Sequence, residues 1–413
     1  MKKNRWLIAV SAVFIHLSIG SVYAYSVFQT PLNQSLGWDY SAVTTAFTIA
    51  IFFLGLSAAF FGRFVEKRGP RVSAFVAAVL YGAGLIGTGF AISMESLIGF
   101  YFTYGVLGGF GLGIGYISPV STLVKWFPDR RGLATGMAVF GFGAGSLIAS
   151  PVAARLMDTV GIPTTFYILG GTYFILMSLG ASYIAKPPED WAPAAAKEKT
   201  DEGEVVKRPD LAQLTANEAI KTRRFYLLWW MMFINISSGI MLISVASPMA
   251  QEIVGLTAIG AATIVGVMGL FNGAGRIGWS TLSDYIGRGN VFLVFFSIQL
   301  VAFLILPFAT NAIMFQILMY LIVSIYGGGF ASLPAFIGDL FGTKQLGAIH
   351  GYLLTAWAMA GVVGPMMVSF LREATDSYSM TFYIFAFLIA TALVTSIFMK
   401  RDIKAVREEK AAS

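Results

Sequence analysis

Long runs of apolar residues, separated by short polar segments, make up most of this sequence. A helix needs about 20 apolar residues to cross the hydrocarbon core of a bilayer. Twelve runs reach this length, so we predict an all-α membrane protein with twelve transmembrane helices. The runs cover roughly residues 6–29, 41–64, 72–92, 96–123, 132–155, 164–185, 225–249, 258–282, 290–309, 312–337, 346–371 and 378–399.

The polar segments on the two sides of the predicted helices differ in charge. The segments after even-numbered runs, together with both ends of the chain, hold nearly all of the 28 Lys and Arg residues. Arg155 and Arg372 fall in the opposite set of loops, and Arg276 falls inside a run. Lys and Arg accumulate on the cytoplasmic side of a bacterial membrane. We therefore expect a bacterial-type inner (plasma) membrane protein with both termini cytoplasmic, and no nucleic-acid partner despite the net charge of +7.

One long polar stretch, residues 186–224, divides the chain into two sets of six runs. We expect an N-terminal six-helix bundle over 1–185, a cytoplasmic linker over 186–224 with a short surface helix around 210–221, a C-terminal bundle over 225–402 and a cytoplasmic tail over 403–413.

The two halves also share marks at a nearly constant offset. Offsets of 218, 215 and 214 positions separate three pairs of similar residues, which are Glu66 and Asp284, Pro119 and Pro334, and Pro151 and Pro365. An offset of this kind indicates an internal repeat, whose two copies commonly hold a substrate site between them near the middle of the membrane.

The composition restricts the chemistry that the chain can perform. It is 57% hydrophobic and 12% charged, whereas soluble domains carry roughly 25% charged residues. There is no cysteine, and the two histidines, His16 and His350, are far apart in the sequence. We therefore expect no metal site and no cofactor, and no hydrolytic or redox constellation can be assembled, so the chain is not predicted to be an enzyme.

Arg276 lies well inside the predicted eighth span, in the stretch "GLFNGAGRIGWSTLSDYIGRG". A charged side chain deep in the bilayer is costly and usually marks a functional site. The nearest acids in the sequence lie at cytoplasmic helix ends, so we expect the guanidinium to bind an anion, whose carboxylate it fits bidentately. Asn272, one turn earlier on the same helix face, can contact the anion or orient the guanidinium.

Several motifs show a family resemblance. The segment "GRFVEKRGPR" resembles the loop between the second and third spans of the major facilitator superfamily. The segment "KWFPDRRGLATGMAVFGFGAGS", residues 125–146, resembles the fifth-span signature of the monocarboxylate transporters and the oxalate:formate antiporter group. The segments "LFNGAGR" and "YGGGFASLPAFIGDLFG" are similar to the antiporter group as well. The resemblance covers the chain outside the central linker, and the bacterial branch is the more similar one.

The resemblance implies a substrate site around the eighth-span arginine. In the resembled transporters this arginine binds the carboxylate of the substrate, and an aromatic cage surrounds the substrate. The cage positions in this chain are Tyr23, Tyr116, Phe142, Tyr326 and Phe330, with Phe28 and Tyr383 as further candidates.

The resemblance also implies a cytoplasmic latch, which breaks and re-forms as the two halves rock. The acids at the ends of the second and eighth spans would pair with nearby arginines. The residues concerned are Glu66, Arg71, Asp284, Arg130 and Arg131; ordinary positive-inside charge is the alternative explanation.

Trp357 in the eleventh span stands where the oxalate:formate antiporter carries a lysine. One deep cation balances one carboxylate, and a second buried carboxylate would lack a partner. The sequence therefore favours a monocarboxylate such as lactate, pyruvate, formate or acetate. The leading interpretation is a proton-coupled symporter, acting as a monomer in the lipid bilayer. His16 is the candidate proton carrier because it is the one deep imidazole; the alternatives are that His16 only packs between helices and that the proton travels on the substrate or through groups linked to Arg276. A carboxylate exchanger of the oxalate:formate type is the alternative.

Overall fold

The structure is a computed structural model, which describes residues 3–188, 191, 210–256 and 258–412. Over these residues it is helical, without a strand. The elements, in chain order, are α1 (Arg5–Ile19), η1 (Gly20–Ala24), α2 (Ser26–Leu36), α3 (Tyr40–Arg68), α4 (Pro70–Ser93), α5 (Leu97–Phe100), η2 (Tyr101–Gly108), α6 (Gly109–Trp126), α7 (Arg131–Val160), α8 (Ile162–Tyr183), α10 (Ala216–Ala219), α11 (Arg223–Val254), α12 (Ala258–Ile286), α13 (Arg288–Ile305), η3 (Leu306–Phe308), α14 (Ala312–Phe341), α15 (Leu346–Leu353), α16 (Thr355–Thr375) and α17 (Ser379–Ala412).

The predicted all-helical membrane architecture is confirmed. Among the described residues, 11 helical segments are long and apolar enough to cross a membrane. The 29-residue helix α12 occupies the position of the remaining predicted span and carries Arg276. Four predicted spans are built from consecutive helical pieces: α1 with η1, α5 with η2 and α6, α13 with η3, and α15 with α16. The last helix, α17, continues through the predicted tail as far as Ala412.

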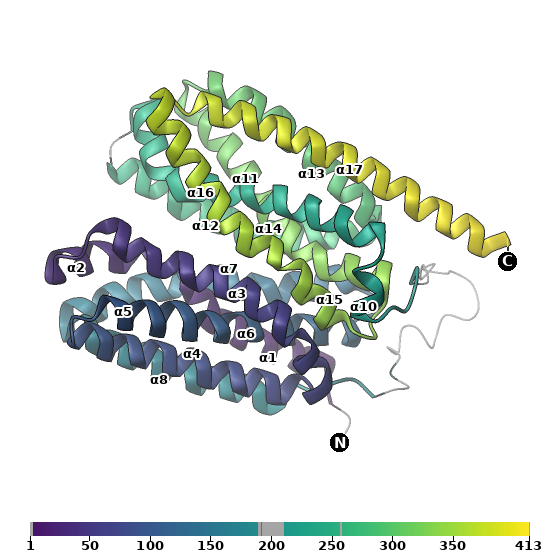
Figure 1. The fold of residues 1–413 in the computed structure, drawn as a ribbon, viewed down its shortest axis with the longest axis horizontal. Coiled ribbons are helices and arrows are strands. Elements are labelled where there is room, and N and C mark those ends of the chain that lie inside the picture. The colour runs from purple at the N-terminus through teal and green to yellow at the C-terminus, as the bar shows by residue number, and fades with distance from the viewer. Residues whose placement is uncertain (1–2, 189–190, 192–209, 257, 413) are drawn as a thin grey trace.

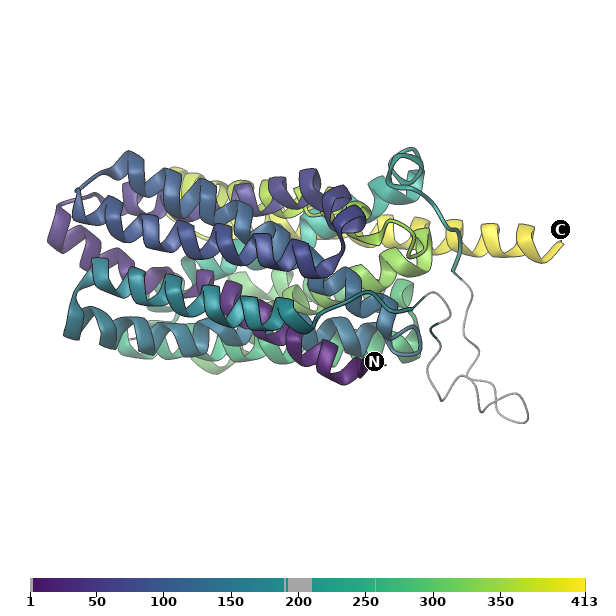
Figure 2. The same ribbon diagram turned by 90° about the horizontal axis from the view of Figure 1, so that it is seen from below.

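The helices form two groups that lie side by side. Figure 1 shows α1 to α8, in purple to teal, on one side and α11 to α17, in teal to yellow, on the other. In Figure 2 the long helices run nearly parallel, and the last turns of α17 project beyond the others. The beginning of α1 and the end of α17 lie at the same end of the molecule as α10, as expected for cytoplasmic termini and a cytoplasmic linker.

Two main contacts join the groups: α3 packs against α15 and α16, and α7 packs against α12. Glycines allow the helix backbones to approach closely, as they commonly do in membranes. A Cβ on Gly136 of α7 would lie 2.7 Å from the carbonyl oxygen of Arg276 in α12, and a Cβ on Gly55 of α3 would lie 2.7 Å from that of Leu354 between α15 and α16. The close approach of α7 places its residues against the middle of α12, where the candidate site lies.

Candidate functional site

Arg276 lies at the centre of the candidate site and is completely buried. Its Nε donates a hydrogen bond of 3.1 Å to Oδ1 of Asn272, and its Nη1 donates one of 3.4 Å to the carbonyl oxygen of Val139 in α7. Among the described residues, Nη2 has no hydrogen-bond partner and no carboxylate forms an ion pair with the guanidinium. The positive charge expected from the sequence is therefore deep, oriented by neutral groups and not neutralised.

Two aromatic rings, one from each half of the chain, lie beside the guanidinium. Its Cζ is 5.7 Å from the ring centroid of Phe142 in α7 and 5.5 Å from that of Phe330 in α14. Cation–π contacts at this distance offset part of the desolvation of a buried cation while leaving its hydrogen-bond donors free. The rings therefore help to hold Arg276 in an apolar position without consuming Nη2.

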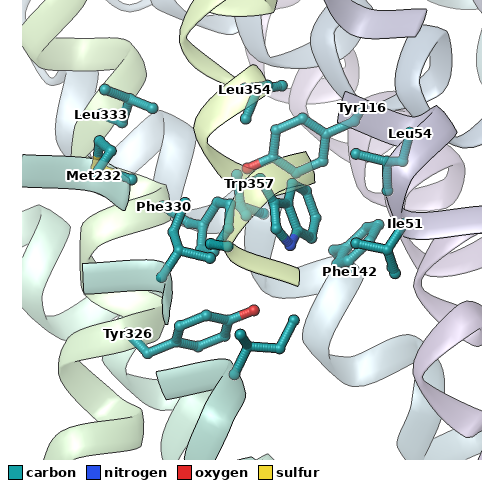
Figure 3. Close-up of a cluster of buried hydrophobic side chains, with 14 of the residues drawn as sticks. Ile51, Leu54, Tyr116, Phe142, Met232, Tyr326, Phe330, Leu333, Leu354 and Trp357 are labelled. Atoms are coloured by element: carbon teal, nitrogen blue, oxygen red, sulfur yellow. The ribbon is translucent and has the colours of Figure 1, made fainter. Parts of the chain in front are cut away.

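The indole ring of Trp357 lies among the rings of Tyr116, Phe142 and Phe330 in an aromatic cluster, as Figure 3 shows. Two of these rings, Phe142 and Phe330, are the ones in contact with Arg276. The ring centroid of Trp357 is 4.5 Å from that of Phe330, 5.5 Å from that of Tyr116 and 5.8 Å from that of Phe142. Trp357 comes from α16 and Tyr116 from α6, so both halves of the chain contribute to the cluster. All four rings are completely buried.

Tyr23 and Tyr326 extend the cluster and also join the two halves. Their hydroxyl oxygens are 3.4 Å apart. The Tyr23 ring lies 5.0 Å from Phe142, and the Tyr326 ring lies 5.2 Å from Phe330. Tyr23 is half-buried and Tyr326 is fully buried. The five expected cage positions are therefore gathered in one place, together with Trp357.

Three buried donors around the cluster lack a partner among the described residues: Nη2 of Arg276, the hydroxyl of Tyr116 and Nε1 of Trp357. Leaving such a group unpaired in an apolar interior costs about 1–3 kcal/mol each. A carboxylate has two oxygens that together accept about four hydrogen bonds. The arrangement is chemically suited to a small anion with an apolar body, because the donors are few and aromatic rings surround them.

Two further candidates lie outside this cluster. Phe28 is buried in the N-terminal half, where its ring packs 4.6 Å from that of Phe166. Tyr383 lies on α17 with 44% of its surface exposed. The structure does not bring either residue to Arg276. The physical reasons are that Phe28, five residues after Tyr23, lies on a different side of the helix, and that Tyr383 lies on the outward face of α17.

Both histidines lie against Tyr116. His16 is fully buried, its ring stacks 5.2 Å from that of Tyr116, and its Nε2 lies 3.0 Å from the Tyr116 carbonyl oxygen. The expectation that His16 is the one deep imidazole is wrong, because His350 on α15 is equally buried and lies 5.7 Å from the Tyr116 ring. The sequence held a signal for this position: His350 precedes Trp357 by seven residues, which places both on one helix face.

At the cytoplasmic end, each half uses an acid to cap a helix of the other half. Asp284 at the end of α12 accepts hydrogen bonds of 3.0 Å from the backbone N–H groups of Gly132 and Leu133 in the first turn of α7. Glu66 near the end of α3 accepts one of 2.7 Å from the N–H of Gly347 in the first turn of α15. Carboxylates are favourable there because helix N-termini present unpaired N–H groups and a positive dipole.

The arginines of the expected latch behave differently from one another. Arg131 forms ion pairs of 2.7 Å with Asp210 of the linker and 3.0 Å with Asp339 of α14, and so connects the two halves. Arg71 and Arg130 are exposed, and no ion pair is formed by either one within the described part of the chain. Their inclusion in the latch is not supported by the geometry, because both side chains point to solvent.

Sequence reasoning missed four members of this cytoplasmic network. They are Lys125, which pairs with Glu66 at 2.9 Å, Arg288, which pairs with Asp284, and the two partners of Arg131, Asp210 and Asp339. Arg288 lies four residues after Asp284, a spacing that the sequence does reveal. The other pairs join segments far apart in the chain and could not be read from spacing.

The described end of the linker is attached to both halves. The N–H groups of Leu211 and Leu214 donate hydrogen bonds of 2.8 Å to the carbonyl oxygens of Asp339 and Phe341 at the end of α14. Asn217 accepts a hydrogen bond from Arg63 of α3. The expected surface helix is present as α10, closed at its start by Thr215 and Glu218 in a capping box. The linker therefore adds to the contacts that hold the cytoplasmic ends together.

A bundle of membrane-spanning helices in two related groups, with a buried site between them, is typical of a multi-pass membrane transporter. The profile of the Major Facilitator Superfamily matches residues 9–365. The chain therefore belongs to the Major Facilitator Superfamily, whose members carry solutes and are not, as a class, enzymes.

Relatives and solved structures agree with this assignment. The chain is 31% identical over 425 residues to the oxalate:formate antiporter of Oxalobacter formigenes, covering 99% of this chain and 96% of the antiporter. It is 28% identical over 362 residues to the uncharacterized MFS-type transporter YhjX of Escherichia coli (strain K12), covering 87% of each. Monocarboxylate transporter 12 of Xenopus laevis is 24% identical over 408 residues, covering 92% of this chain and 85% of the relative.

Among solved structures, the proton:xylose symporter XylE is similar in fold, with a TM-score of 0.71 at 16% identity, covering 97% of this chain and 96% of that one. The transporter FucP in its outward conformation has a TM-score of 0.68 at 16% identity, covering 95% of this chain and 98% of that one. At these identities the likeness shows the fold alone.

Proposed function

We propose that this protein carries small monocarboxylates, of the size of lactate or pyruvate, across the membrane by alternating access and together with a proton. The observation that carries the proposal is Arg276, a fully buried guanidinium with an unpaired Nη2, no acidic partner among the described residues, and aromatic rings on two sides. Such a cation is suited to one carboxylate, which would accept hydrogen bonds from it and from Tyr116. The relatives named as monocarboxylate transporters support this substrate class.

The preference for one carboxylate rests on the absence of a second deep cation from the cluster. Trp357, which packs on Phe330 and Tyr116, contributes an N–H group but no charge. A dicarboxylate would place its second charge in apolar surroundings, at a cost of several kcal/mol per ion. In this proposal the aromatic rings contact the small organic body of the substrate, and Asn272 orients the guanidinium.

A second function is favoured by a specific observation. The oxalate:formate antiporter of Oxalobacter formigenes is 31% identical over almost the whole chain. Exchange of one carboxylate for another would use the same arginine and the same latch without proton movement. The bacterial relatives support placement in an inner membrane, where we propose that the chain acts as a monomer divided at 1–185, 186–224, 225–402 and 403–413.

Transport by purified protein in proteoliposomes tests the proposal. Uptake of radiolabelled lactate, pyruvate, formate and oxalate would be measured with and without an inward proton gradient, and in vesicles preloaded with unlabelled substrate at equal pH. Symport predicts accumulation of monocarboxylates driven by the gradient and little uptake of oxalate. If preloaded substrate exchanged for labelled substrate and the proton gradient had no effect, the antiporter alternative would be favoured. The proposed substrate class would be contradicted if none of these acids were taken up, or if oxalate were taken up as well as lactate.

A further inference from the structure

We propose that His350 carries the coupled proton, and that Tyr116 lies between this proton site and the substrate site at Arg276. The inference rests on the proposed symport. It assigns a role to a residue that neither the motifs nor the sequence reasoning singled out. The juxtaposition behind it is a fully buried imidazole on α15, in contact with a tyrosine of the other half whose hydroxyl is also unpaired.

His350 is unusual because nothing in its surroundings uses its polarity. It is 0% exposed, and neither Nδ1 nor Nε2 has a hydrogen-bond partner among the described residues. An unpaired nitrogen in an apolar interior destabilises the fold, because its hydrogen bonds to water are lost and not replaced. A phenylalanine or leucine would fill a packing position without this cost. An imidazole kept in such a place is explained more simply by a group that it binds in part of the transport cycle.

His16 is less suited to the same task. Its Nε2 lies 3.0 Å from the carbonyl oxygen of Tyr116, so the proton on this nitrogen is held by a backbone acceptor. Its ring is stacked on that of Tyr116 with an interplanar angle of 13°. This geometry fixes α1 against α6 and makes His16 a positioning residue. The ring of His350 is inclined at 54° to that of Tyr116, with both nitrogens available.

The position of His350 along α15 connects it to the cytoplasmic latch. Gly347, which donates its N–H to Glu66, lies three residues earlier, about one turn toward the cytoplasm. Separation of the cytoplasmic ends would break this contact and expose the first turns of α15 to water. His350 would then exchange its proton with the cytoplasm, whereas in the structure described it contacts Tyr116 and the interior.

Few charged or titratable groups lie near this imidazole. Tyr116 of α6 and His16 of α1 are the nearest ones from the N-terminal half, and Glu66 of α3, paired with Lys125, lies beyond the start of α15. Arg63 of α3 lies 5.9 Å from the ring of Tyr352, on the same helix as His350. The other helices packed on α15 carry their described charges toward their ends: Glu218 in α10, Arg223, Arg224 and Glu252 in α11, Asp339 in α14 and Arg372 in α16. Within the described part of the chain, no adjacent carboxylate therefore neutralises a proton on His350.

The charge balance then gives an electroneutral cycle. From the outside, one carboxylate binds at Arg276 and one proton binds to a ring nitrogen of His350, so the loaded and empty carriers have equal charge. After the halves rock, the proton and the carboxylate both leave to the inside. The empty carrier returns with a neutral imidazole. Without the imidazole, the carboxylate would cross with its uncompensated negative charge.

His350→Gln and His16→Gln, compared with wild type in proteoliposomes, test this assignment. Glutamine keeps a hydrogen-bonding side chain but cannot take up a proton in this pH range. The measurements are lactate accumulation driven by an inward proton gradient, acidification of the interior reported by a trapped pH dye, and lactate counterflow at equal pH, which needs no net proton movement. We expect H350Q to lose gradient-driven accumulation and acidification while its counterflow falls far less. We expect H16Q, which loosens the packing on Tyr116, to lower counterflow and gradient-driven accumulation by the same factor and to keep the proton-to-lactate ratio of wild type.

Two results would overturn the inference. The first is H350Q that acidifies the vesicles with the same proton-to-lactate ratio as wild type. The second is a result obtained with both H350Q and His350→Asn, provided that both variants unfold at the same temperature as wild type. In that result, counterflow falls as much as gradient-driven uptake does. A wild-type protein that shows no gradient-driven uptake would instead remove the proposed symport itself, and the proton site with it.

Discussion

The Nε of Arg276 donates a hydrogen bond of 3.1 Å to Oδ1 of Asn272, one helical turn earlier in α12. The amide holds the plane of the guanidinium and leaves its charge intact. Because the second main contact of Arg276 is the backbone carbonyl of Val139, the two groups that orient the cation are both neutral. The full positive charge therefore remains available to an anion in the cluster.

Asn272→Asp tests this division between orientation and charge. The acid would keep the contact with Arg276 but neutralise it when ionised, so it would compete with the substrate carboxylate. Because the adjacent guanidinium favours the ionised form of this acid, lowering the pH to 5 should not restore the charge of Arg276. We therefore expect N272D to bind lactate more weakly than wild type at both pH 8 and pH 5. Lactate binding titrations at both pH values check this expectation. If N272D bound lactate at pH 8 with the affinity of wild type, the charge of Arg276 next to residue 272 would not be the charge that binds the substrate.

Trp357→Lys tests the argument from charge number. Lysine at this buried position would place a second cation beside Phe330 and Tyr116, where a dianion could bridge it to Arg276. We expect W357K to gain oxalate binding, seen as inhibition of lactate uptake by oxalate, and to bind monocarboxylates less well. The gain should shrink at high salt, because screening weakens charge-driven binding. If the wild type transported oxalate as fast as lactate, the claim that one deep cation restricts the site to monocarboxylates would be contradicted.

Tyr116→Phe removes one of the unpaired donors without changing the shape of the cluster. A hydrogen bond to a charged group contributes about 1.5–3 kcal/mol, so the affinity for lactate should fall roughly 10- to 150-fold. Tyr101→Phe is the matched control, since the Tyr101 hydroxyl bonds the backbone of Ala42 within the N-terminal half. Lactate titrations of both variants would settle the comparison; equal affinities would exclude the Tyr116 hydroxyl from the site.

Asp284→Ala tests the latch. Loss of a cap on a helix N-terminus costs typically about 1 kcal/mol, or roughly fivefold in the equilibrium between open and closed cytoplasmic ends. The chain has no cysteine, so Ser121→Cys would act as a single reporter. Ser121 is 3% exposed and lies against Gly347 of the other half. The Ser121→Cys reporter would be combined either with D284A or with the exposed control Arg130→Gln. We expect maleimide to label the reporter faster in the protein with D284A than in the control. Equal labelling rates would contradict the role of Asp284.

Much of this architecture could be predicted from the sequence because a bilayer imposes simple rules on length and charge. Apolar runs of about 20 residues became helices, and the depth of Arg276 followed from its place in one run. The close helix contacts at glycines such as Gly136 also fit their abundance in the spans. These features depend on local sequence.

The features that were missed depend on which side of a helix faces the protein. Tyr23 and Phe28 are five residues apart, which places them about 140° apart around a helix, so Tyr23 reaches the cluster whereas Phe28 packs on Phe166. For Tyr383 the sequence gives little guidance, because lipid-facing and core-facing positions of a spanning helix are both apolar. The pairing of Arg131 with Asp210 brings together residues 79 positions apart, which no local pattern reveals.

The most direct test of this account is equilibrium binding of radiolabelled lactate, pyruvate, formate and acetate to purified Arg276→Gln and Arg276→Lys. Wild type and the exposed control Arg130→Gln should bind at least one of these acids saturably. Both Arg276 variants should lose that binding while their unfolding temperatures stay close to that of wild type. In R276Q, removing a buried charge that has no ion-pair partner among the described residues offsets the loss of its contacts with Asn272 and Val139. Binding of the same acid by R276Q with wild-type affinity would contradict the central claim that Arg276 holds the substrate carboxylate.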